Sequence, residues 1–201
     1  MSFHIFGDSH ANFNFVNFNC INHYINSLTM NRIGRDKLDC INFMNYSIKN
    51  NDTVIYQVGE VDCRNNIGKQ LQLNRNIDEI ITTLVDNFIE SIKINVKNFE
   101  KINVIICCIL PTMNSSDYYN KKGIIEESCY PWIGNDFERS NYTKLINQLL
   151  KNKCKIENFL FLDYYHYYED NNGTLKLDYT SDGIHINNNN FILKELNELN
   201  K

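Results

Sequence analysis

The stretch Asn103-Val104-Ile105-Ile106-Cys107-Cys108-Ile109-Leu110-Pro111 is the most apolar part of the chain. An apolar run without polar alternation is typical of a strand that is buried on both faces of a parallel sheet. Pro111 ends the strand, because proline cannot donate a hydrogen bond to a neighbouring strand. The run is also far shorter than the roughly 18 apolar residues that mark a membrane-spanning helix. It therefore predicts a buried strand of a parallel sheet and excludes a membrane span here.

The rest of the chain alternates between short strands and helices. Four further strands are predicted, over residues 2–6, 20–25, 53–58 and 159–163. Helices are predicted over residues 29–46, 77–92 and 136–151 and after residue 190; the second of them repeats apolar residues at helical spacing. This alternation favours an α/β fold with a parallel sheet and helices on both faces. Because no repeat or Pro/Gly/Ser linker interrupts the chain, we expect a single domain over residues 1–201.

Composition and charge narrow the class of protein and its partners. The chain has 201 residues, of which 43% are hydrophobic and 22% charged, with a formal net charge of −4. These values indicate a soluble globular protein and give no support for a nucleic-acid or anionic-membrane partner. Residues 1–7 lack the basic start and long apolar block of a signal peptide, so we expect a cytoplasmic protein. The oligomeric state is left open.

Seven cysteines are scattered along the chain without the spacing of a metal site. We interpret them as reduced thiols and expect neither a metal nor a cofactor. They are Cys20, Cys40, Cys63, Cys107, Cys108, Cys129 and Cys154.

The segment Gly7-Asp8-Ser9-His10 follows the first predicted strand. In an open parallel sheet, ligands bind at the carboxyl ends of the strands, near the point where the strand order reverses. A serine at a strand-to-helix turn exposes its hydroxyl beside free backbone N–H groups, which can hold a developing oxyanion. A serine hydroxyl still needs a base to act as a nucleophile. Gly, Asp and Ser are also common in turns, so this segment alone does not decide the function.

A candidate base lies at the other end of the chain, in Ser181-Asp182-Gly183-Ile184-His185. An aspartate three residues before a histidine can accept the Nδ1–H of the imidazole, which leaves Nε2 to take the serine proton. The spacing is weak evidence by itself, because a histidine near a C-terminal helix is often a surface residue. Together with Ser9, the pair predicts a Ser9–His185–Asp182 triad.

With these two segments in place, the chain resembles the SGNH (GDSL-type) hydrolases. Their nucleophile block matches residues 7–9, and their last block, Asp-x-x-His, matches Asp182 to His185. Their third block falls on residues 59–62, and Gly34 is the candidate for the glycine whose N–H joins that of Ser9 in the oxyanion hole. The resemblance implies a flavodoxin-like three-layer α/β/α sandwich with a five-stranded parallel sheet. It also implies ester chemistry without a metal or cofactor.

The chain departs from the family pattern in its third block. The family's oxyanion-binding Asn is replaced by Val61, and the loss of one such donor typically costs about 10²–10³ in rate. Arg64 either supplies a replacement donor or pairs with Glu60 or Asp62, and both interpretations stay open. The block also resembles that of SGNH-like proteins that accompany glycosyltransferases, which suggests a sugar substrate. We expect the substrate to contact Asp8, His10, Glu60, Asp62 and Arg64.

The favoured function is therefore a serine esterase or deacylase that acts on an O-acyl ester, of a small molecule or glycan and most simply of a carbohydrate. An O-acyltransferase would use the same triad and differ only in its acceptor. A binding protein on a degenerate SGNH fold is a second class, for which the replacement by Val61 is the best argument. A flavodoxin-like module that binds a nucleotide or flavin is a third class.

Two further segments carry expectations. Residues 112–135 lack helical or strand periodicity, which favours a functional loop. The aromatic cluster Tyr164, Tyr165, His166, Tyr167 and Tyr168 is interpreted as a cover over the sheet edge in preference to a sugar-stacking surface.

Overall fold

The computed structural model describes residues 1–122 and 131–199. Within them, five parallel strands form one sheet in the order β2-β1-β3-β4-β5. The strands are β1 (Phe3–Gly7), β2 (Ile21–Tyr24), β3 (Thr53–Gln57), β4 (Asn103–Cys107) and β5 (Leu160–Leu162). The chain runs from β1 to one side for β2 and to the other for β3, so the strand order reverses at β1. This is the flavodoxin-like order, and the predicted α/β fold with a five-stranded parallel sheet is confirmed.

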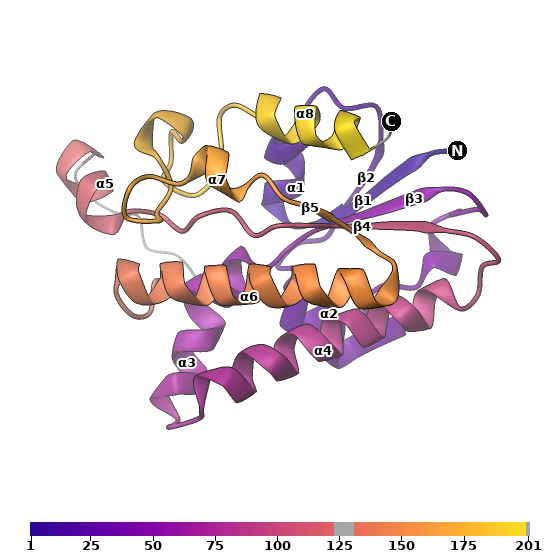
Figure 1. Ribbon diagram of the computed structural model, residues 1–201, viewed down its shortest axis with the longest axis horizontal. Coiled ribbons are helices and arrows are strands. Elements are labelled where there is room, and N and C mark those ends of the chain that lie inside the picture. The colour runs from indigo at the N-terminus through magenta and orange to yellow at the C-terminus, as the bar shows by residue number, and fades with distance from the viewer. Residues whose placement is uncertain (123–130, 200–201) are drawn as a thin grey trace.

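Helices cover both faces of the sheet (Figure 1). The helices α2, α3, α4 and α6 lie on one face, and α1, α7 and α8 lie on the other. Their bounds are α1 (Ser9–Asn14), α2 (Met30–Asp36), α3 (Ile67–Gln72), α4 (Ile77–Val96), α5 (Ser115–Lys122), α6 (Asp136–Glu157), α7 (Tyr165–Tyr168) and α8 (Asn190–Leu199). A π-helical turn at Asp62–Asn66 precedes α3. None of the helices in the described part of the chain is long and apolar enough to cross a membrane.

Side chains of the inner strands alternate between the two layers of helices. In register across the sheet, Phe6 pairs with Tyr56, and the side chains of both belong to the core under α2 and α4. Their neighbours Ile5 and Ile55 are also paired but point into the core under α1 and α8. Both sides of these strands are buried, which explains why they read as apolar runs without alternation.

All five predicted strands are present, with ends that differ by a few residues. The strand predicted to reach Leu110 ends at Cys107 in the sheet, although residues 108–110 stay buried and Cys108 N still donates to Leu162 O at 2.9 Å. The helix predicted over residues 29–46 is shorter: α2 ends at Asp36, because Lys37 has a φ of 48° and turns the chain. Short 3₁₀ turns follow at residues 37–39 and 43–45.

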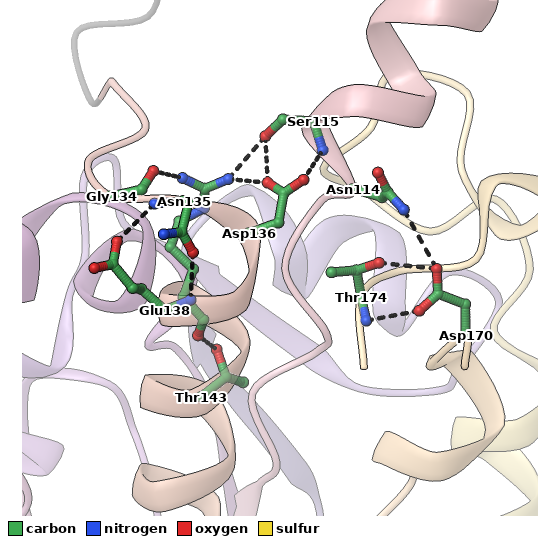
Figure 2. Close-up of polar contacts among 10 residues, drawn as sticks. Asn114, Ser115, Gly134, Asn135, Asp136, Glu138, Thr143, Asp170 and Thr174 are labelled. Carbon is green, nitrogen blue, oxygen red and sulfur yellow. Dashed lines mark hydrogen bonds and ion pairs between the residues drawn. The ribbon is translucent and has the colours of Figure 1, made fainter. Parts of the chain in front are cut away.

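The segment 112–135 contains a helix, α5, which the sequence did not indicate. Ser115 fixes its start, because the amide and hydroxyl of Ser115 both donate to the Asp136 carboxylate, at 2.9 and 2.6 Å (Figure 2). The guanidinium of Arg139 donates to the same carboxylate and to Gly134 O. Residues 123–130, with Cys129, lie outside the described residues. The six other cysteines are free thiols.

The tyrosine cluster covers the sheet, as predicted. Tyr164, Tyr165 and Tyr168 are buried in the core under α8, whereas His166 is exposed. Tyr164 donates a short hydrogen bond from its hydroxyl to the side-chain oxygen of Gln57, at the carboxyl end of β3. Tyr164 therefore connects the segment that follows β5 to β3, in the middle of the sheet.

Candidate active site

Ser9 stands where β1 ends and α1 begins, at the point where the strand order reverses. Gly7 makes this sharp turn possible, because a Cβ at Gly7 would lie 2.6 Å from both Ala11 Cβ and Gln57 O. Asp8 is the N-cap of α1, and its carboxylate accepts a hydrogen bond from His10 N at 2.9 Å. As the first residue of the helix, Ser9 has an amide that the helical ladder does not use.

A tight turn before α8 presents Asp182 and His185. The hydroxyl of Thr180 accepts a hydrogen bond from Gly183 N at 2.8 Å. Oδ1 of Asp182 accepts two more, from Ile184 N at 2.9 Å and His185 N at 2.8 Å. Gly183 has a φ of 86°, a conformation that favours glycine. The turn thus holds the Asp182 carboxylate against the His185 ring.

The three residues of the predicted triad come together across 176 positions of sequence. Ser9 Oγ lies 2.8 Å from His185 Nε2, and His185 Nδ1 lies 2.6 Å from Asp182 Oδ2. The His185 side chain is 17% exposed and that of Asp182 is 46% exposed. A hydroxyl, an imidazole and a carboxylate in this order can move a proton from the hydroxyl to Nε2.

Asp182 is set to remain ionised. Burial alone would raise its pKa, but the hydrogen bonds from the His185 ring and from the amides of His185 and Ile184 outweigh burial and hold the pKa well below the ordinary value. An ionised Asp182 favours the imidazole tautomer with its proton on Nδ1. Nε2 then faces the Ser9 hydroxyl as an acceptor.

Two aromatic rings from α1 pack against His185. The Phe13 ring stacks on it with centroids 4.3 Å apart and planes 20° apart. The His10 ring lies at 4.8 Å with a tilt of 45°. The sequence did not indicate Phe13, because its spacing of four residues from Ser9 places it beside the serine only once α1 is known to be a helix.

A buried layer of charged side chains lies next to the triad. His10 Nδ1 is 3.2 Å from Asp8 Oδ1, and Arg64 Nε is 3.0 Å from Glu60 Oε1. The Arg64 guanidinium also lies 4.7 Å over the Trp132 ring. Burial lowers the pKa of His10, but the Asp8 carboxylate and then Glu60 more than compensate, so the pKa of His10 is raised. All four charged residues are nearly inaccessible to solvent, and Arg64 makes the ion pair that one of its two interpretations required.

The predicted role of Gly34 in the oxyanion hole does not agree with its position in the fold. Gly34 is buried in α2, and a Cβ there would lie 2.8 Å from Asn87 Cβ on α4. Its amide is inside the hydrogen-bonded ladder of α2 and cannot also bind an oxyanion. Gly34 therefore allows two helices to approach each other. In the third block, Val61 is buried and its side chain offers no hydrogen-bond donor.

The expectation that Asp62 contacts the substrate does not agree with its position either. It is fully buried and accepts hydrogen bonds from Met30 N at 2.8 Å and from Asn66 Nδ2 at 2.9 Å. Burial raises its pKa to about 6. Asp62 thus anchors the start of α2 beside a cavity of about 320 Å³ between α2, α3 and α4, which Asn31, Asn66 and Asn87 also line.

Comparison with known proteins shows which solved structures share this fold. No protein-family model and no curated protein matches the chain. Among solved structures, the chain is similar to one described as an acylhydrolase from Bacteroides fragilis, with a TM-score of 0.64 and 19% identity over 100% of this chain and 88% of that one.

Two further solved structures are similar to this chain. A GDSL-like lipase from Bacteroides thetaiotaomicron has a TM-score of 0.60 and 18% identity over 98% of this chain and 84% of that one. A member of the lipolytic G-D-S-L family from Veillonella parvula has a TM-score of 0.58 and 17% identity over 99% and 97%. At such identities the similarity shows the fold, and the chain has the fold of the GDSL-type (SGNH) lipolytic hydrolases.

Proposed function

We propose that the protein is a serine hydrolase of SGNH type that cleaves a carboxylic ester. The observation that carries the proposal is the unbroken line of contacts from Ser9 Oγ through the His185 ring to Asp182, at 2.8 and 2.6 Å. It lies at the reversal of strand order, where open α/β sheets bind their ligands. The fold that the chain shares with lipolytic hydrolases supports the same class of reaction.

In the first half of the reaction, Ser9 Oγ attacks the acyl carbon while His185 Nε2 takes the hydroxyl proton. The π electrons of the carbonyl move to its oxygen, and the Ser9 amide at the start of α1 donates a hydrogen bond to this oxyanion. Asp182 stabilises the imidazolium that forms. The imidazolium then gives its proton to the departing alkoxide, which leaves as an alcohol and leaves the acyl group on Ser9.

In the second half, water replaces the alcohol. His185 removes a proton from the water as it attacks the acyl-Ser9 ester, and returns that proton to Ser9 Oγ when the ester breaks. A carboxylic acid is released. Val61 cannot act as a side-chain donor in either half, which predicts a slower enzyme than one with a complete oxyanion hole.

We extend the proposal to an O-acyl ester of a carbohydrate as the substrate. Ser9 is partly exposed, and the neighbouring side chains of Asp182 and Phe13 are about half exposed, which suits an ester on a bulky polar alcohol. Acetate release from O-acetylated sugars, measured with and without a free sugar acceptor, checks this. Transfer of the acetyl group to the acceptor in place of its release would identify an O-acyltransferase.

The triad is tested by the covalent chemistry of Ser9. A fluorophosphonate is expected to add once to the intact protein, as read by mass, and the adduct is expected to be absent from Ser9→Ala. Ser116→Ala, a change at an exposed serine of α5, is the matched control and keeps the adduct. A well-folded wild-type protein that takes no adduct would contradict the proposal and favour a binding protein on this fold.

A further inference from the structure

A cavity of about 540 Å³ lies at the connection between α7 and α8, which also carries Asp182 and His185. The segments that follow β4 and β5 both contribute to it, together with the start of α6. Because the strands are parallel, these segments lie at the same edge of the sheet as Ser9. The cavity is therefore on the catalytic edge, and the triad uses none of its side chains. Its walls include Asn114, Asp136, Phe137, Asn171, Asn172 and Thr174.

The turn after α7 gives the cavity one fixed wall. The Asp170 carboxylate accepts hydrogen bonds from Thr174 N and Thr174 Oγ1, both at 2.9 Å (Figure 2). It also accepts one from Asn172 N at 2.8 Å. Leu175 N donates to Thr112 O at 2.7 Å, which joins the turn to the segment after β4. This wall is formed without a ligand, as in most sites that bind small molecules.

The side-chain amides of Asn171 and Asn172 lie next to each other on this wall. Both side chains are exposed, and no described residue forms a hydrogen bond with either amide group. Each amide offers two N–H donors and one carbonyl acceptor. An exposed amide by itself is ordinary protein surface. Two adjacent amides in a cavity present donors and acceptors together, which matches neighbouring hydroxyls on a sugar ring.

Phe137 adds an apolar surface from α6. Its side chain is 71% exposed at the second position of the helix. A single exposed aromatic residue is also ordinary. Here, however, the ring lines the same cavity as the two amides, so an apolar face and several hydrogen-bonding groups share one space. This combination fits a sugar, whose ring has C–H bonds on its faces and hydroxyls around its rim.

The charge of the walls favours a neutral sugar. Asp136 lines the cavity, and no basic side chain is among the described residues that do so. Its carboxylate accepts two hydrogen bonds from Ser115 and pairs with Arg139 (Figure 2). Arg139 is itself buried. Because the carboxylate of Asp170 lies behind Thr174 in the same wall, an anionic sugar would meet two negative charges and no exposed positive charge.

We propose that this cavity is a binding subsite for a neutral glycan, with the Phe137 ring against one sugar ring and the amides of Asn171 and Asn172 on its hydroxyls. The role of the subsite rests on the proposed function, because it would hold the carbohydrate part of an ester whose acyl group lies at Ser9. Binding of the glycan itself requires no turnover.

The first test is an NMR titration of the side-chain amide resonances of Asn171 and Asn172. The resonances are assigned by their loss in Asn171→Ala and Asn172→Ala. The neutral probes are cellotetraose, xylotetraose, mannotetraose and chitotetraose, and the anionic probe is tetragalacturonate. At least one neutral probe is expected to shift both resonances, and tetragalacturonate is expected to shift neither. Resonances that respond to no neutral probe, or that respond equally to tetragalacturonate, would overturn the inference.

Variants then locate the binding. Phe137→Ala should weaken the Kd of the bound probe by about 10-fold, because it removes the aromatic face. Asn172→Ala should weaken the Kd by about 2–10-fold, the effect of one or two hydrogen bonds. The matched controls are Ile156→Ala, at a 69% exposed position near the other end of α6, and Asn152→Ala, at an exposed amide of that helix. Both controls should bind like the wild type, and a Phe137→Ala protein that does so would contradict the inference.

Fluorophosphonate labelling separates this inference from the proposed function. Binding of a neutral probe by a protein that takes no label would contradict the proposed function and leave the glycan site standing. Labelled protein that binds no neutral probe would overturn the glycan site alone. Where both hold, the acetylated form of the bound probe should be hydrolysed with a KM that rises about 10-fold in Phe137→Ala and stays at the wild-type value in Ile156→Ala.

Discussion

At the scale of single residues, Asp182 decides whether His185 acts as a base. In Asp182→Asn, the side-chain amide can present its NH₂ to His185 Nδ1 and so favour the tautomer with the proton on Nε2, which cannot accept from Ser9. The two amide-to-carboxylate bonds of the turn involve Oδ1 and can be kept by an asparagine oxygen. We expect the rate of fluorophosphonate labelling to fall by about 10³–10⁴, with little change in melting temperature.

The matched control is Asp163→Asn, which removes a surface carboxylate paired with Lys151 at 2.9 Å and should label at the wild-type rate. A near-normal rate in Asp182→Asn would place the orienting group elsewhere. Ser9, Asp182 and His185 were accessible to sequence analysis because each belongs to a short local pattern, and because the carboxyl ends of parallel strands meet at one edge.

At the scale of elements, Gly34 tests how α2 and α4 pack. A methyl group at this position would lie 2.8 Å from Asn87 Cβ and 3.0 Å from Asn87 C, a backbone atom that cannot move away freely. Gly34→Ala should therefore lower the free energy of unfolding by about 1–3 kcal/mol in denaturant titrations. The folded protein should still take the fluorophosphonate at the wild-type rate. Slower labelling of Gly34→Ala with unchanged stability would indicate that Gly34 belongs to the oxyanion hole. Arg35→Ala, at the exposed neighbouring position, is the control.

The elements that sequence analysis missed share a physical reason. Helix α1 spans six residues with no apolar repeat and depends on the Asp8 cap and on the fit of Ala11 against Gly7. Helix α7 has four residues, too few for a period to show. The role of Gly34 could not be read from block order, because it depends on Asn87, more than fifty positions away. Local patterns find the long helices, whereas tertiary contacts fix the short ones.

At the scale of the whole molecule, the sheet explains why two distant segments make one site. Strand β1 lies inside the sheet, so the residues after it are held by β3 on one side and β2 on the other. The turn that carries His185 is fixed separately, by the bridge between Thr180 and Ile186 and by the burial of Ile186 under α8. Each half of the site thus belongs to a different rigid part of the fold, and the Ser9–His185 contact depends on both.

The buried Asp62 makes the stability of this assembly depend on pH. Its pKa is raised to about 6 in the folded protein, whereas an unfolded aspartate titrates near pH ~3.9. Between these values the folded state holds a proton that the unfolded state has lost, so stability falls as the pH rises from about 4 to 6, by up to about 3 kcal/mol. Asp62→Asn removes this contribution but loses hydrogen bonds to the start of α2 at every pH. As the pH rises from about 4 to 6, the unfolding free energy of the wild type should therefore fall by up to about 3 kcal/mol relative to that of Asp62→Asn. The unfolding free energy of Asp86→Asn, a change at a surface ion pair, should change with pH in parallel with that of the wild type. Parallel curves for Asp62→Asn would mean that Asp62 is ionised throughout, and that its three amide donors outweigh its burial.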